Sequence, residues 1–138
     1  MAKYFKTQQP NILAQIGAMK SKYPQFHSTV KGVCVTFTGE LMVKPELPIY
    51  TVSVEYRGDQ KPLVHIISPS LVENAKHTYS DKSLCLYHPD NFNWHSSRLV
   101  AKEIMQWTIA WIYFYEYWLQ SGEWIGPEVS HSKEKTNE

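Results

Sequence analysis

Residues 77–89 read HTYSDKSLCLYHP, and the chain changes character on either side of them. The segments before this stretch alternate apolar and polar residues and are rich in β-branched side chains, a pattern typical of β-strands. The segment after it is a loop that leads into a long aromatic run with helical period. Cys85 therefore lies between strands and a helix, with His77 eight positions upstream. This arrangement indicates a thiol displayed on an α+β scaffold.

A lone cysteine also has an ordinary structural explanation. Free cysteine is among the most buried residue types and packs as a small hydrophobic side chain. Cysteine–histidine pairs are common, and local signatures do not transfer freely between protein families. The spacing therefore leaves two interpretations of Cys85 open, a reactive thiol and a buried packing residue. The second cysteine, Cys34, lies inside an alternating strand pattern, and we interpret it as structural.

Length and composition bound the class of protein. The chain has 138 residues, and we expect a single domain at residues 1–131 followed by a polar, flexible tail at 132–138. The formal net charge of +1 gives no basic field for nucleic acid or an anionic membrane. The opening residues contain no signal-peptide core, and no apolar run reaches the roughly 18 residues of a membrane span. These features favour a cytoplasmic protein with reduced thiols.

The N-terminal segment predicts a helix that begins near Thr7 and ends before Pro24. Threonine is a good N-cap, and the residue before a proline is pushed out of the helical region. Pro10 then falls in the first turn, where proline is tolerated. Between these points apolar residues recur at helical spacing, at Ile12, Leu13, Ile16 and Met19.

Three alternating segments predict an antiparallel β-meander. The first contains the alternating residues around Val35 and ends at a turn formed by Gly39-Glu40. The second covers residues 49–56 and the third covers residues 63–67, with a short glycine-containing turn between them. The short connections favour neighbouring antiparallel strands.

A long connection and an aromatic helix complete the chain. Residues 71–94 show no regular period, and loops of this length in a compact domain tend to be functional. Ser96 or Ser97 is expected to cap a helix that runs to about Gln120 and stops at Gly122. Because this helix is apolar over most of its circumference, it must be covered on more than one side.

A cysteine nucleophile needs access, a raised thiolate fraction and stabilisation of the oxyanion formed during acyl transfer. A loop before a helix offers access and free backbone N–H groups. His77 is a candidate for a base, for a hydrogen bond that holds the loop, or for oxyanion stabilisation. Tyr79, Asn74 and His88 are further polar candidates near Cys85. Asn74 has the better chemistry for an oxyanion donor, and His88 is close enough in sequence to alter the pKa of the thiol.

A metal site is the competing interpretation. His77, Cys85, His88 and His95 supply four possible ligands within nineteen residues. Their spacings match neither a paired Cys-x2-Cys motif nor a His-x3-His motif. We therefore expect no metal and no other cofactor.

The expected order of elements resembles the ubiquitin-conjugating fold, with an N-terminal helix, an antiparallel meander, a long active-site loop and C-terminal helices. In ubiquitin-conjugating enzymes a His-Pro-Asn triplet precedes the active cysteine by about the distance between His77 and Cys85. Thr78 and Tyr79 replace the proline and the asparagine in this chain, and the spacing is somewhat shorter. The asparagine is the family's usual aid to oxyanion stabilisation. The resemblance therefore implies a catalytic Cys85 but leaves open whether His77 takes over that role.

Further motifs follow the same order along the chain, namely His77-x-Tyr79, Leu84-Cys85-Leu86-Tyr87-x-Pro89, Trp94 and Tyr115-Glu116-x-Trp118-Leu119-x-x-Gly122-Glu123-Trp124-x-Gly126-x-Glu128. With them the chain more closely resembles the conjugating-enzyme-like proteins of bacterial anti-phage operons that encode a cyclic-oligonucleotide synthase, the CBASS class. The resemblance covers roughly residues 1–131 and implies that Cys85 carries a protein C-terminus, that of the synthase (a CD-NTase), as a thioester and passes it to a lysine amine. No adenylating domain is fused to the chain, so it resembles the short, stand-alone form, and a separate activating enzyme is a possible further partner.

The same resemblance leaves a second hypothesis. Variants of the ubiquitin-conjugating fold that bind proteins without catalysis exist in the broader family. The absent asparagine after His77 is compatible with such a non-catalytic binding module. Both hypotheses predict a protein partner, and neither predicts binding to nucleic acid or a membrane.

Overall fold

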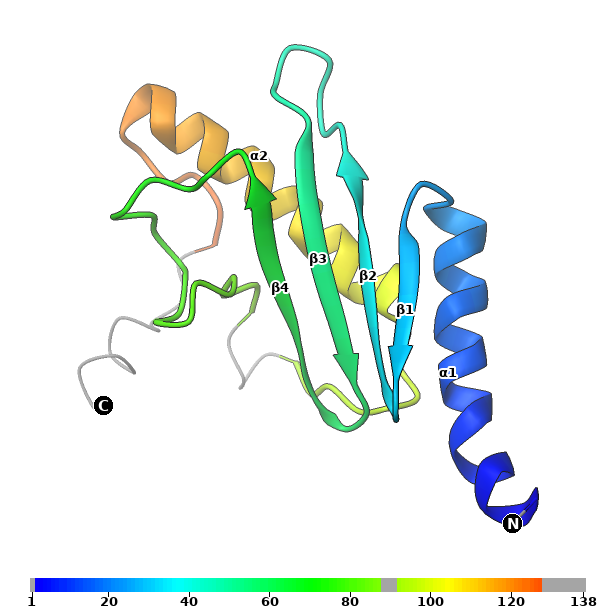
Figure 1. Ribbon diagram of the computed structural model, residues 1–138. Coiled ribbons are helices and arrows are strands. Elements are labelled where there is room, and N and C mark those ends of the chain that lie inside the picture. The colour runs from blue at the N-terminus through cyan, green and yellow to red at the C-terminus, as the bar shows by residue number, and fades with distance from the viewer. Residues whose placement is uncertain (1, 88–91, 128–138) are drawn as a thin grey trace.

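The computed structural model describes residues 2–87 and 92–127, which form an α+β arrangement (Figure 1). The expected domain end at residue 131, the tail at 132–138 and His88 lie outside these ranges. Helix α2 crosses one face of the sheet, and α1 lies beside the edge formed by β1 (Figure 1). The elements are α1 (Ala2–Lys22), β1 (His27–Lys31), β2 (Cys34–Leu41), β3 (Tyr50–Arg57), β4 (Gln60–Ser68), the π-helix η2 (Val100–Ile104) and α2 (Met105–Ser121).

The predicted antiparallel meander is confirmed, because the strands follow the order β1-β2-β3-β4 with antiparallel neighbours. Alternate residues of β3 are buried, at Tyr50, Val52, Val54 and Tyr56, and the residues between them are partly exposed. This is the period of two expected for a strand with one core face. The turn between β3 and β4 uses Gly58 at φ +69°, a backbone conformation that glycine adopts without steric cost.

Strand β1 has no counterpart among the strands that the sequence pattern predicts. All five of its residues are exposed, so no alternation of apolar and polar residues marks it. It is held to β2 by a regular register, from Lys31 opposite Cys34 to His27 opposite Thr38. Backbone pairing with a neighbour therefore creates this edge strand.

The predicted turn at Gly39-Glu40 is wrong, because both residues continue β2 and pair with Val52 and Thr51 of β3. Gly39 serves a packing purpose there. A Cβ atom at this position would lie 2.6 Å from the Cγ atom of Phe26. Glycine is needed for the close approach of the Phe26 ring, and it does not end the strand.

Helix α1 begins earlier than predicted, at Ala2 and not near Thr7, so Pro10 lies inside it. The segment before Pro10 contains one alanine, two lysines and two glutamines, which are good helix formers. These residues extend the helix past the candidate cap. The predicted end is confirmed, because α1 stops at Lys22, two residues before Pro24.

The second helical segment begins at Val100, later than the predicted caps at Ser96 and Ser97. Ser96 is held by the β3–β4 hairpin instead. Its backbone N–H donates to Asp59 Oδ1 at 2.9 Å, and its carbonyl oxygen accepts a hydrogen bond from the Tyr56 hydroxyl at 2.9 Å. Contacts with a distant part of the chain therefore keep Ser96 out of the helix.

A glutamine from α1 caps the second helical segment. The side-chain oxygen of Gln15 accepts a hydrogen bond from the Val100 backbone N–H at 3.0 Å. The side-chain nitrogen of the same residue donates to the Arg98 carbonyl oxygen at 2.6 Å. Gln15 is buried, so this polar side chain is satisfied inside the core while it joins α1 to η2.

Helix α2 ends as predicted at Gly122, which has φ +80° and donates its N–H to the Trp118 carbonyl oxygen at 2.8 Å. Its second apolar side is covered by the segment after the helix, since the Trp124 ring lies 5.8 Å from that of Trp111. The expectation of cover on more than one side is thus met by the chain itself. Among the described residues, no helix combines the length and apolar character needed to cross a membrane.

Candidate active site

A small hairpin brings His77 and Cys85 together. Thr78 and Leu84 form an antiparallel bridge. The Cys85 backbone N–H then donates to the His77 carbonyl oxygen at 2.8 Å. The eight-residue separation in sequence is therefore closed into direct backbone contact, and the two residues that the sequence singled out are neighbours.

The tip of this hairpin is a tight turn fixed by Asp81. The Asp81 carboxylate accepts hydrogen bonds from the Ser83 backbone N–H at 2.9 Å and from its hydroxyl at 2.6 Å. These hydrogen bonds lower the pKa of Asp81, because they stabilise its charged form. Lys82 completes the turn with a left-handed backbone, at φ +73°. The turn is thus held in one shape, which fixes the register between the two arms.

The hairpin joins the edge of the sheet to helix α2. On one side, the Leu84 backbone N–H donates to the Val64 carbonyl oxygen of β4 at 2.9 Å. On the other side, the indole N–H of Trp111 in α2 donates to the His77 carbonyl oxygen at 3.1 Å. That oxygen accepts two hydrogen bonds, and His77 presents it from a left-handed backbone at φ +57°. A non-glycine residue adopts this conformation only where the surroundings hold it.

Cys85 is mostly buried, with 4% of its surface exposed, but it lines a pocket of about 270 Å³. His77, which is 6% exposed, lines the same pocket, and its ring centroid lies 4.6 Å from that of Trp124. The sulfur is therefore a partly enclosed group at the wall of a cavity. We name this cavity the tryptophan pocket, and it is lined by His77, Cys85, Leu86, Trp107, Ala110, Trp111, Phe114, Trp124 and Pro127.

The expectation of free backbone N–H groups around the thiol is wrong for the cysteine and the residue before it. The N–H of Leu84 is used by β4, and that of Cys85 is used by His77. The helix begins only at Val100, so its N-terminal N–H groups do not follow the cysteine directly. Stabilisation of an oxyanion at Cys85 must therefore come from other groups, and His77 is the sequence candidate that lines the pocket.

The other sequence candidates lie elsewhere or outside the described ranges. Asn74 is exposed and does not line the tryptophan pocket. The Tyr79 ring lies under the ammonium group of Lys61, 4.0 Å from its centroid, and His88 is not described. In residues 2–87 and 92–127, no three His, Cys, Asp or Glu side chains gather as a metal site requires.

The aromatic walls of the pocket are candidate functional residues that sequence reasoning did not assign to the site. Trp107, Trp111 and Phe114 come from α2, and Trp124 comes from the segment after it. The signal for the three helix residues is the excess of apolar surface on the helix, and the signal for Trp124 is its place in the motif that carries the family resemblance. Gly126 lets the segment pack back on the helix, since a Cβ atom there would collide with the Phe114 ring.

Tyr87 places a neutral phenol close to the cysteine. Burial, and then the charge of an ionised Cys85, raise the pKa of Tyr87 to about 12. Its ring packs against Phe92 and Trp107, at centroid distances of 4.9 and 4.8 Å. The Cys85 thiol lies 4.0 Å from the Tyr87 carbonyl oxygen, in the range of a weak sulfur hydrogen bond. Tyr87 therefore stays protonated at neutral pH and keeps this side of the cysteine uncharged.

We expect Trp111→Phe to loosen the hairpin while it preserves most of the ring packing. The change removes the indole N–H that binds the His77 carbonyl oxygen, which should lower the free energy of unfolding by about 1 kcal/mol. Denaturant unfolding measures this loss, and alkylation of Cys85 by iodoacetamide should become faster as the hairpin opens. Trp118→Phe is the matched control, because Trp118 lies on the same helix outside the pocket. Equal alkylation rates in the two variants would contradict this role of Trp111.

A comparison with models of known protein families finds a match that includes the residues of this site. The family model described as "Type II CBASS E2 protein" matches residues 15–132, which include the end of α1, the whole sheet, the hairpin and α2. A comparison with curated proteins finds no significant match. The match covers far more than half of the chain and agrees with the helix, the four-stranded antiparallel sheet and the C-terminal helix. The chain therefore belongs to the type II CBASS E2 family, with an E2-like role in CBASS anti-phage defence.

Proposed function

We propose that the chain is a ubiquitin-conjugating-like acyl transferase that carries a protein C-terminus as a thioester on Cys85 and passes it to a lysine amine. The acyl donor is the C-terminal tail of a cyclic-oligonucleotide synthase of the same defence system. One observation carries the proposal: Cys85 and His77 line one pocket, at the position that the resemblance to conjugating enzymes gives the active cysteine. Membership of an E2 family supports it.

The chemistry has two acyl transfers. In the first, the Cys85 thiolate attacks the carbonyl carbon of an activated tail, a carbon–sulfur bond forms, and the activating group leaves with its electron pair. In the second, a neutral lysine amine attacks the thioester carbonyl, a carbon–nitrogen bond forms, and the sulfur leaves as a thiolate while the amine loses a proton. Each step passes through a tetrahedral oxyanion. A ring N–H of His77 is the donor that we assign to this oxyanion.

The burial of Cys85 suits this chemistry. Aromatic walls that exclude water slow the hydrolysis of a thioester and strengthen the electrostatic interactions beside it. The same burial means that the tail has to enter the pocket before it reacts. Loading then depends on the fit of the tail as well as on the nucleophilicity of the sulfur.

The test is to isolate the adduct. The chain is co-expressed with a cyclic-oligonucleotide synthase and with an adenylating enzyme that activates the tail of the synthase. It is then purified under mildly acidic, non-reducing, denaturing conditions, in which thioesters survive. We expect a species with the summed mass of the two chains minus one water, which hydroxylamine cleaves, and which peptide mapping assigns to Cys85. Cys34→Ala should form the same adduct, because Cys34 lies on β2 outside the pocket. Conjugation to lysine without any adduct on Cys85 would contradict the proposal.

A second candidate function is a binding module with the same fold but no catalysis. The 4% exposure of Cys85 favours it, because a sulfur that is only packed in the core would look similar. The two candidates differ in thiol reactivity. In a binding module, iodoacetamide would label Cys85 only after denaturation, and partner binding would survive Cys85→Ala. In a transferase, the folded chain is labelled at Cys85, through the pocket that the sulfur lines.

A further inference from the structure

The walls of the tryptophan pocket are fixed by their own packing. The Trp124 ring lies 5.8 Å from that of Trp111, 5.9 Å from that of Phe114 and 4.6 Å from that of His77. Gly126 brings the backbone of the C-terminal segment against Phe114 with no space for a Cβ atom. Rings locked in this way keep one shape, so the pocket exists before any substrate arrives.

The lining of the pocket carries no acidic side chain and no lysine or arginine among the described residues. A charged group that entered would lose its hydration without gaining a counter-charge, which is costly. An apolar side chain would instead gain by burial against the aromatic rings. One polar group stands out, since the Trp124 indole N–H is buried and has no acceptor within the described ranges. It is suited to donate to a backbone carbonyl oxygen of a bound peptide.

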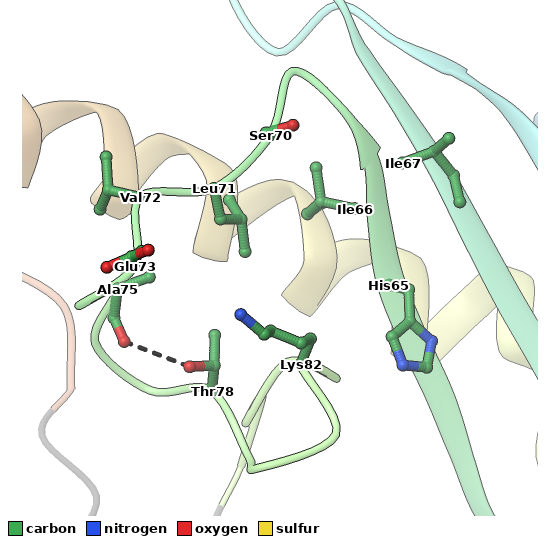
Figure 2. Close-up of a pocket in the computed structure, with 10 residues that line it drawn as sticks. All are labelled: His65, Ile66, Ile67, Ser70, Leu71, Val72, Glu73, Ala75, Thr78 and Lys82. Carbon is green, nitrogen blue, oxygen red and sulfur yellow. Dashed lines mark hydrogen bonds between the residues drawn. The ribbon is translucent and has the colours of Figure 1, made fainter.

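Two charged side chains at or near the hairpin, Lys82 and Glu73, line a different cavity. This cavity has a volume of about 230 Å³. It lies between β4 and the loop that precedes the hairpin, and Lys82 points into it beside Thr78 (Figure 2). His65 also lines it, and Cys85 does not. The apolar character of the tryptophan pocket is therefore specific to the side of the hairpin on which the sulfur lies.

The position of the sulfur limits what the pocket can hold. An extended chain advances about 3.5 Å per residue, so the last residues of a tail bonded to the sulfur must lie in or beside the pocket. Its volume of about 270 Å³ is small for a binding site and suits the side chains of one or two residues. The occupant is thus the end of the acyl chain itself.

We propose that the tryptophan pocket selects acyl donors by an apolar side chain at one of the two positions before the C-terminal residue of the tail. This inference rests on the acyl-transfer function proposed above and names its substrate class. Tails with leucine, isoleucine or phenylalanine at these positions are accepted, and tails with lysine, arginine, aspartate or glutamate there are rejected. The Trp124 N–H holds the backbone of the same tail.

Peptide thioesters test this selection without an activating enzyme. The probes are hexapeptides that end in glycine as the 2-mercaptoethanesulfonate thioester, with leucine, serine, lysine or glutamate at either or both of the two preceding positions. The Cys85 thiolate displaces mercaptoethanesulfonate, which leaves as a thiolate, so no other reactant is needed. Loading is followed by intact mass spectrometry on the full chain carrying Cys34→Ala. We expect the best leucine peptide to load about tenfold faster, or more, than its lysine and glutamate counterparts.

A charge placed in the pocket wall should change the selection. Ala110 lines the pocket from α2, and Ala110→Glu supplies the counter-charge that a lysine tail lacks. This variant should load lysine peptides faster and leucine peptides more slowly than the unchanged pocket. Ala110→Gln adds nearly the same volume without the charge, so the gain for lysine peptides should be confined to Ala110→Glu. The rate at which iodoacetamide alkylates Cys85 in each variant shows separately whether the sulfur is still accessible and nucleophilic.

The outcomes separate this inference from the proposed function. Faster loading of leucine peptides, reversed by Ala110→Glu, supports both. Loading of all peptides at equal rates overturns the selection and leaves acyl transfer at Cys85 standing. No loading of any peptide on a Cys85 that iodoacetamide still alkylates overturns the proposed function, and the inference with it.

Discussion

Replacing Cys85 with alanine should abolish conjugate formation, and replacing it with serine should yield a stable adduct in place of a labile one. Removing a nucleophile costs several orders of magnitude in rate, and Cys85 is the only thiol among the described residues that line the pocket. A serine hydroxyl attacks less readily, but the resulting oxyester resists thiols and transfers slowly to amines. Cys85→Ser should therefore accumulate a linked product that survives reducing conditions, which denaturing gel electrophoresis and intact mass measurement detect.

The control for this prediction is the other cysteine. Cys34→Ser makes the same chemical change on β2, opposite Lys31, and should conjugate at the wild-type rate. The folded state of both Cys85 variants is checked by thermal unfolding, since Cys85 is buried and its loss leaves a small change in packing. Conjugation by a folded Cys85→Ala at the wild-type rate would refute the transferase mechanism.

Tyr50→Phe should lower the free energy of unfolding by about 1.5–3 kcal/mol at neutral pH. The Tyr50 hydroxyl donates a short hydrogen bond to the Glu116 carboxylate of α2, and both residues are buried. Removal of the hydroxyl leaves that carboxylate without this donor in a poorly hydrated interior, and the cost of burying a polar group then appears in full. Denaturant unfolding at pH 7 measures the loss, and Tyr117→Phe, an exposed tyrosine on the same helix, is the control.

The same contact makes a prediction about alkaline pH. Burial, and then Glu116, raise the pKa of Tyr50 well above its ordinary value of 10, so the folded state holds the phenol proton more tightly than the unfolded state does. The stabilisation is therefore complete below about pH 10, and it is lost as the pH rises above that value. Unfolding curves between pH 8 and pH 11 should show the gap between wild type and Tyr50→Phe narrowing. A gap that stays constant across this range would contradict the prediction.

Local patterns predicted the parts of the fold that local forces build. The alternation along residues 50–56 matches the buried face of β3, and Gly122 ends α2 in the left-handed conformation. The start of the second helical segment was misplaced because distant groups set it. Asp59 holds Ser96, and Gln15 caps Val100 from another helix. Interactions between residues tens of positions apart leave no local pattern to read.

The candidate site also has a part that the sequence predicted and a part that only tertiary packing determines. The sequence spacing and the family resemblance predicted that His77 and Cys85 act together, and the hairpin does bring them into contact. The pocket beside them was not predicted, because its walls come from α2 and from the segment around Trp124. Which face of an almost wholly apolar helix meets the cysteine depends on tertiary packing. The backbone conformation of His77 depends on it as well.

The two hydrogen bonds accepted by the His77 carbonyl oxygen have a consequence for how a donor protein is presented. They tie Cys85, the proposed nucleophile, and Trp111, one wall of the tryptophan pocket, to a single carbonyl oxygen. An incoming polypeptide end must then enter a small pocket whose described walls are already in place. Donors whose last residues are folded onto their own surface would be excluded until those residues detach. Release of that end in the donor then becomes a step at which conjugation can be regulated.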